Sequence, residues 1–200
     1  MNKMLKKYYL ILFLLLSSTS FGQLIKFGEA KGLFMSVGTG PRIPVGVFGE
    51  NRNIGIGADV DFSYTDNKFL PVFIYAKFGY QHYPGKQALY KKSDYSSFSS
   101  NVIVIQPGVR LYLPPLFNQD FILLPVVEGG LSWAYVMDQH QFKIDTGIKN
   151  YDNDSNYLGF QIGAGFSMFL MDVMGYYNIM YEHQFLSFDL RVRIPIFVKV

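Results

Sequence analysis

The strongest constraint on the fold is a strict alternation of apolar and polar residues at the C-terminal end of the sequence. Every second residue from Phe188 to Val200 is apolar, and the positions between them include Asp189, Arg191 and Arg193. Successive side chains of a β-strand point to opposite faces, so this period predicts a strand with one apolar and one polar face. Because nothing polar interrupts the apolar face, we expect the closing strand of a barrel.

The same alternation recurs along the chain and predicts eight strands and no helix. The expected strands are 33–48, 53–64, 70–82, 101–113, 121–137, 156–170, 173–184 and 187–200. Pro41 and Pro44 leave open whether the first strand is broken. Pro107, Pro125 and Pro195 fall inside expected strands, where a missing N–H predicts β-bulges.

Two long polar segments, 83–100 and 138–155, are expected to be loops at the same end of the barrel. The connections at the other end are short, as in outer-membrane barrels with short periplasmic turns and longer external loops. In the first loop, Lys86, Lys91 and Lys92 would either meet lipopolysaccharide phosphates or a partner, or belong to a solvated surface loop.

The N-terminal segment 1–22 has the pattern of a cleaved export signal, which leaves 23–200 as the barrel domain. Lys3, Lys6 and Lys7 precede a short apolar run, and small residues precede Gln23. The apolar run is too short to span a bilayer as a helix. Removal of this segment leaves a formally neutral chain, which argues against nucleic-acid binding. The absence of Cys excludes disulfides and thiolate metal sites.

The polar faces of the expected strands carry charges of both signs, whereas the centres of the apolar faces carry none. An Arg or Lys facing lipid near the midplane costs about 2–4 kcal/mol, so the apolar faces are expected to point outward. The polar faces would then form a side-chain-filled lumen in which charges pair. The expected lumen network comprises Arg42, Asp59, Asp61, Lys77, Arg110, Glu128, Glu182, Asp189, Arg191 and Arg193.

Aromatic residues fall near the two ends of the expected strands, as the girdles of a transmembrane barrel require. One expected girdle comprises Phe62, Tyr64 and Phe121, and the other Tyr80, Trp133, Tyr135 and Tyr181. The fold predicted from these patterns is all-β, an eight-stranded antiparallel up-and-down transmembrane β-barrel with a polar, filled lumen.

These segments together resemble the small eight-stranded outer-membrane β-barrels of Gram-negative bacteria, the OmpA/OmpX-like group. The resemblance extends over essentially the whole chain after residue 22 and rests on the signal, the alternation, the loop lengths and the C-terminal strand. It implies a location in the bacterial outer membrane, contact with outer-membrane lipid and lipopolysaccharide, and insertion by the barrel-assembly machinery.

Three functions remain open at this point. A non-enzymatic barrel would stabilise the envelope or present the loops 83–100 and 138–155 to an external partner. A narrow porin-like channel would use the Arg-rich lumen for small anions. A soluble periplasmic lipocalin-like binder would require the apolar faces to point inward.

Enzymatic activity and a cofactor are not expected. Lipid A deacylases of the outer membrane place Ser two residues after His, but Pro84, Phe142 and Phe185 follow the three histidines here at that spacing. His82, His140 and His183 lie near the expected external rim, and His82 and His183 are interpreted as interfacial residues. The spacing Asp152, Asp154, Asn156 suits Ca²⁺, but Tyr157 and Gly163 replace the Gly and Glu of an EF-hand, so we expect a solvated loop.

Overall fold

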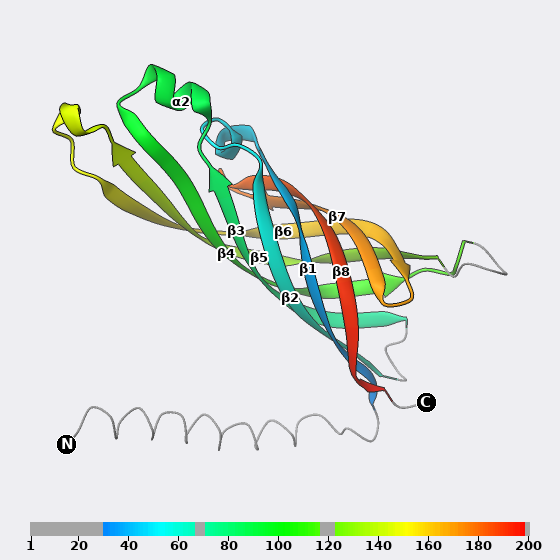
Figure 1. Ribbon diagram of the computed structural model, residues 1–200. Coiled ribbons are helices and arrows are strands. Elements are labelled where there is room, and N and C mark those ends of the chain that lie inside the picture. Colours follow the sequence, from blue (N-terminus) through cyan, green and yellow to red (C-terminus); the bar gives the residue numbers. More distant parts are fainter. Residues whose placement is uncertain (1–29, 67–70, 117–122, 199–200) are drawn as a thin grey trace, which may run out of the picture.

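Each of the eight alternating stretches is a β-strand in the computed structural model, which describes residues 30–66, 71–116 and 123–198. The strands are β1 (Ala30–Val45), β2 (Gly55–Asp66), β3 (Val72–Pro84), β4 (Tyr95–Tyr112), β5 (Leu124–Phe142), β6 (Tyr151–Met168), β7 (Met171–Met180) and β8 (Gln184–Val198). Each strand pairs antiparallel with its neighbours in sequence, and β8 pairs with β1 (Figure 1). The predicted closed, up-and-down barrel is confirmed.

The barrel has a large stagger between its first and last strands. Paired residues followed once around the ring lead from Tyr135 of β5 back to the same strand at Pro125, ten residues away. A stagger of this kind means that the strands are tilted against the barrel axis.

The predicted orientation of the two faces is also confirmed. In β8, Leu190 and Val192 are 48% and 49% exposed, whereas Arg191 between them is 1% exposed. The same alternation of buried and exposed residues runs along β2 and β7. Since the buried members are largely polar or charged, the barrel is polar inside and apolar outside.

Two segments that were expected to be loops contain regular structure. Strand β4 begins at Tyr95, and β5 and β6 continue as a hairpin to Phe142 and from Tyr151, well beyond the rest of the barrel (Figure 1). A short helix, α2 (Gln87–Lys92), precedes β4, although no helix was predicted. The described residues also include the 3-10 turns η1 (Gly46–Gly49) and η2 (Ile144–Thr146).

The prolines in strands behave in two ways. Two successive residues of β1 pair with Phe197 and Pro195, so β8 has an extra residue and the expected bulge there is confirmed. Pro107 and Pro125 pair with β3 and β6 without a shift of register, so bulges at these two positions were wrongly predicted. Strand β1 is continuous through its own prolines.

The start of β1 and the end of β8 lie at the end of the barrel opposite the projecting hairpin of β5 and β6 (Figure 1). We call the hairpin end the mouth. No helix among the described residues is long and apolar enough to cross a membrane. The expected signal segment lies outside the described residues.

Candidate functional site

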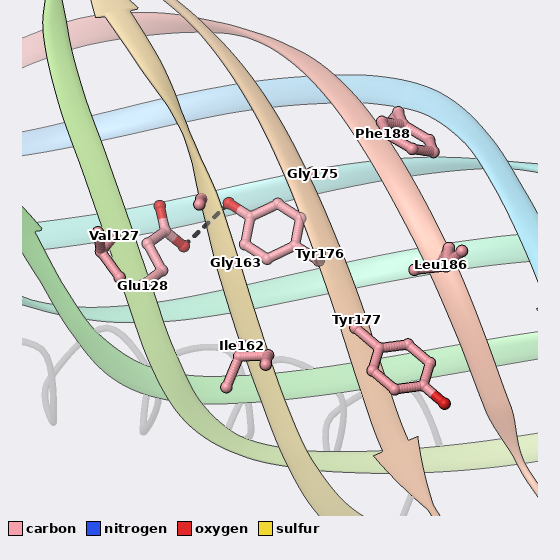
Figure 2. Close-up of a pocket in the computed structure, with 10 residues that line it drawn as sticks. Val127, Glu128, Ile162, Gly163, Gly175, Tyr176, Tyr177, Leu186 and Phe188 are labelled. Carbon is pink, nitrogen blue, oxygen red and sulfur yellow. Dashed lines mark hydrogen bonds between the residues drawn. The ribbon is translucent and has the colours of Figure 1, made fainter.

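The lumen is organised around Glu128 of β5, whose buried carboxylate accepts three hydrogen bonds. Arg110 Nε donates to Oε1 at 2.6 Å, and Arg191 donates to the same oxygen at 3.1 Å. The Tyr176 hydroxyl donates to Oε2 at 2.9 Å, a bond that Figure 2 shows. Asp61 lies 3.3 Å from Arg110 and 3.5 Å from Arg191. Two carboxylates therefore share two guanidiniums, which offsets the cost of burying all four charges.

A second group of ion pairs lies closer to the mouth. Arg42 of β1 donates to Asp59 at 2.6 Å and to Asp189 at 2.5 Å, and all three side chains are buried. One guanidinium thus links β1 with both of its neighbours, β2 and β8. The group therefore joins three consecutive strands along one side of the lumen.

An amide, an aromatic ring and a further carboxylate contact the remaining inward cations. Lys77 donates to the Gln161 amide oxygen at 3.0 Å, and its Nζ lies 3.9 Å from the centre of the Tyr176 ring. At the end opposite the mouth, Arg193 donates to Asp172 at 2.6 Å. Each of these cations has a neighbour of negative charge or negative electrostatic potential.

The structure brings the expected network together in the lumen, except for one member. Strand β7 ends at Met180, and Glu182 lies in the following turn, exposed and with a φ of 56°. The placement of Glu182 in the lumen is therefore wrong, because the alternation was extended past the last residue of the strand.

Several members of the buried network were missed from the sequence. Asp172 falls between the expected strands 156–170 and 173–184, but β7 begins at Met171 and directs Asp172 inward to Arg193. Gln106 donates to Ser132 at 2.9 Å and to Asn178 at 2.6 Å across the barrel. Gln106, Ser132 and Asn178 alternate with outward apolar residues along their strands. The period of two could therefore have placed these neutral side chains in the lumen.

An apolar layer closes the lumen at the mouth. Its buried members are Phe48, Tyr83, Val102, Val104, Ala134, Val136, Met180 and Phe185. Phe48 belongs to η1, so the connection between β1 and β2 folds back into the barrel. Its ring lies 5.0 Å from that of Tyr83 in an edge-to-face arrangement.

His183 belongs to this layer, and its interpretation as an interfacial residue is wrong. The tight turn after β7 directs its ring into the mouth, where it lies 3.9 Å from Phe48 and 5.2 Å from Tyr157. Neither ring nitrogen has a hydrogen-bond partner among the described residues. Burial lowers the pKa of His183 to about 3, and the positive charge of Arg52 adds to the effect. The imidazole is therefore neutral. His82, by contrast, contacts Asn101 on the outside of the barrel.

Arg52 fastens the connection between β1 and β2 to the projecting strands. Its guanidinium donates two bonds of 2.7 Å to Asp138 and one of 2.5 Å to Ser100, which also donates to Asp138. The same group lies 4.3 Å from the Phe48 ring centre. This contact holds η1 in the mouth.

The projecting sheet consists of the outer parts of β4, β5 and β6. Strand β7 pairs with β6 only from Gly159 onward, so residues 151–158 pair with β5 alone. Aromatic side chains gather on the inward-facing side of this sheet, where His140 stacks on Tyr151 at 4.4 Å and Tyr95 stacks on Phe142 at 4.7 Å. Partial burial lowers the pKa of His140.

The opposite side of the projecting sheet is polar. Asp152, Asp154 and Asn156 alternate along β6 and are exposed, so they belong to a strand and not to the loop that was expected. Asp154 accepts a hydrogen bond of 2.6 Å from the Tyr135 hydroxyl. In α2, Lys91 and Lys92 occupy the last turn and are exposed.

The expected girdle residues lie on the outer surface where the structure describes them. Phe62, Tyr80 and Tyr181 are exposed, and Tyr64, Trp133 and Tyr135 are partly exposed. Phe62 and Tyr64 are near the end of β2 that lies away from the mouth, whereas the others lie toward the mouth. Phe121 lies outside the described residues.

Solved structures resemble this barrel, although no family model and no curated protein matches the sequence. The attachment invasion locus protein Ail of Yersinia pestis superposes with a TM-score of 0.52 at 10% identity, over 82% of this chain and 99% of that one. Neisserial surface protein A has a TM-score of 0.49 at 14% identity, over 82% of this chain and 97% of that one. The chain has the fold of the small eight-stranded outer-membrane barrels.

Proposed function

We propose that this chain is a non-enzymatic barrel of the bacterial outer membrane, with a sealed lumen and a projecting sheet that binds a partner outside the cell. The observation that carries the proposal is the reversed polarity of the barrel. Apolar side chains such as Phe78, Val109, Leu131 and Ile194 are about half exposed, while most of the described charged side chains that lie within the barrel wall are buried. A bilayer is the solvent in which this arrangement is stable.

The filled lumen supports a structural role over transport. The ion pairs of Glu128 and Asp61 cross the lumen from β5 to β8 and from β2 to β4, those of Arg42 join β1 to β2 and β8, and the apolar layer with Phe48 lies between them and the mouth. Each inward carboxylate of these groups accepts a bond from a guanidinium. None is therefore free to act as a general base, which favours a protein without enzymatic activity.

The projecting sheet supports the binding role. Among the described residues, no strand pairs with the second edge of β6 over 151–158. An exposed edge offers unpaired backbone groups to an extended segment of another protein. In this proposal, residues 1–22 direct export and are removed, the assembly machinery inserts the barrel, and lipid and lipopolysaccharide surround it.

Insertion is tested on the purified protein, and orientation is tested on intact cells. The purified protein should migrate differently on gels before and after heating in detergent. Trypsin added to cells should cleave at Lys143 or Lys149, which flank η2 at the tip of the hairpin. Recovery of the unextracted protein in the soluble periplasmic fraction would overturn the proposal.

The narrow channel is separated from this proposal by conductance. We expect no reproducible single-channel steps from the protein in planar bilayers, because guanidinium and carboxylate groups fill the lumen. Reproducible steps whose ion selectivity changes in Arg191→Ala would show that the lumen conducts and that the structural role is incomplete.

A further inference from the structure

Two apolar grooves mark the outer surface of the barrel on either side of Val127. The larger, of about 560 Å³, lies over β6 and β7, and its outward walls include Ile162, Tyr177 and Phe188 (Figure 2). The smaller, of about 340 Å³, lies over β4 and β5 and includes Val109. Both are open to the surroundings of the barrel.

The floor of each groove contains a glycine for which the fold itself gives no reason. A Cβ at Gly175 would meet the Phe188 ring at 3.5 Å, an ordinary contact, and a Cβ at Gly129 would meet only a backbone oxygen at 4.0 Å. The other glycines in described strands differ, since a Cβ at each would come within 3.0 Å of another atom. At Gly163, for example, it would lie 2.3 Å from the Tyr176 ring.

A glycine within a strand weakens the strand, and it often marks a place where a ligand or another backbone approaches closely. Packing inside the chain requires the glycines that would clash, but it does not require Gly129 or Gly175. Their effect on the surface is to deepen the two grooves beside Val127. These positions therefore point to an occupant outside the chain.

We infer that the two grooves hold acyl chains of a membrane phospholipid at fixed positions on the barrel, with Val127 as the ridge between them. This inference rests on the proposed location in a membrane. The side chains that face outward in the larger groove are apolar apart from the Tyr177 hydroxyl, which donates to Gln184 at 2.7 Å at the mouth side. The carboxylate of Glu128 behind the floor is turned inward to Tyr176 (Figure 2).

An acyl chain fits these grooves better than a second copy of the barrel does. The grooves are continuous with the apolar outer surface of the barrel, which we call the belt. Lipid therefore surrounds the grooves if the barrel is inserted in a membrane. A stable contact between two proteins buries about 1,200 Å² or more, whereas two narrow convex barrels touch along a line. A thin flexible chain can enter a groove on a convex surface and gains free energy from each methylene group that it buries against the floor.

The test fills each groove with a larger side chain of the protein itself. Gly129→Leu and Gly175→Leu place a side chain where the acyl chain would lie, and a Cβ has room at both sites; heat-modifiable migration checks that the variants fold. Val60→Leu, on the belt at β2 away from both grooves, is the matched control. The proteins are reconstituted in vesicles of palmitoyl-oleoyl phosphatidylethanolamine and phosphatidylglycerol, extracted in mild detergent and examined by native mass spectrometry.

We expect the unaltered barrel and Val60→Leu to retain phospholipid after extraction. The double glycine variant should bind phospholipid at least about tenfold more weakly, a change of about 1.4 kcal/mol in binding free energy. Equal retention by all three proteins, or no retention by the unaltered barrel, would overturn the inference. A dimer that the glycine variants abolish would assign the grooves to a second copy instead.

Flotation of the reconstituted barrel with the vesicles separates this inference from the proposed function. A barrel that does not float overturns both, because no membrane then supplies the acyl chains. A barrel that floats but retains no phospholipid leaves the proposed location standing and overturns the grooves as lipid sites.

Discussion

A buried histidine without a hydrogen-bond partner makes the mouth of the barrel sensitive to acid. The folded protein holds His183 in its neutral form, since its pKa is lowered to about 3, whereas an unfolded chain binds this proton near pH 6.5. Between these values the unfolded state binds more protons than the folded state. The free energy of unfolding therefore falls as the pH is lowered through 6.5 toward 3.

The substitution His183→Phe should remove this dependence. Its neighbours Phe48, Tyr157 and Phe185 are aromatic, so a phenyl ring suits the site. From pH 8 to pH 5 the unaltered protein should lose about 2 kcal/mol of unfolding free energy relative to the variant, at about 1.4 kcal/mol for each pH unit below 6.5. Urea unfolding in phospholipid vesicles, followed by the fluorescence of Trp133, measures the difference.

His82→Gln controls for the loss of a histidine as such, because the ring of His82 lies outside the barrel beside Asn101. It should leave the difference between pH 8 and pH 5 unchanged. Equal pH dependence of the unaltered protein and His183→Phe would show that the imidazole of His183 is not held neutral.

Glu128 and Glu182 provide a matched pair of carboxylates in one chain. Glu128→Gln should lower the unfolding free energy by about 3 kcal/mol or more, because it leaves the guanidiniums of Arg110 and Arg191 with Asp61 alone. Glu182→Gln, in the exposed turn, should change it by no more than about 0.5 kcal/mol. The same urea experiment measures both variants, and similar losses in the two would show that the lumen network contributes little to stability.

At the scale of the strand, neighbouring glycines of β5 should respond in opposite ways to a methyl group. Gly129→Ala should raise the unfolding free energy by about 0.5–1 kcal/mol, since its Cβ would meet only a backbone oxygen at 4.0 Å. Gly130→Ala should lower it by about 1–3 kcal/mol, because its Cβ would lie 2.3 Å from the Pro107 carbonyl oxygen. Unfolding in detergent without phospholipid removes any contribution of lipid, and a stabilised Gly130→Ala would contradict the close contact across β4 and β5.

The ends of the strands were harder to predict than their faces. Within the barrel, alternation gave the correct orientation of Asp189, Arg191 and Asp59 because one face is apolar and the other is charged. Where β4 projects, its sequence is mostly Ser on both faces and shows no apolar alternation, so residues 95–100 are expected to be a loop, although Phe98 and Ser100 are buried in the structure. Glu182 illustrates the opposite error, since the alternation in the sequence continues past Met180 but the strand ends there in a tight turn.

At the scale of the whole molecule, period-two alternation was sufficient to predict the number of strands, their order and the filled lumen. The contacts that join distant segments were not visible in the same pattern. Phe48 and Arg52 belong to a connection with no period, and their positions in the mouth depend on Asp138, 86 residues beyond Arg52. Such contacts follow from the closed barrel and not from local sequence.

The lumen has two barriers in series, and this arrangement makes a prediction for the whole barrel. The apolar layer with Phe48 closes the mouth, and the ion pairs of Glu128 and Arg191 close the middle. Phe48→Gly should remain silent in planar bilayers because the ion pairs still block the path, and Arg191→Ala should remain silent because the mouth is closed. Only the double variant should show steps in current, and conductance in Phe48→Gly alone would show that the ion pairs do not seal the lumen.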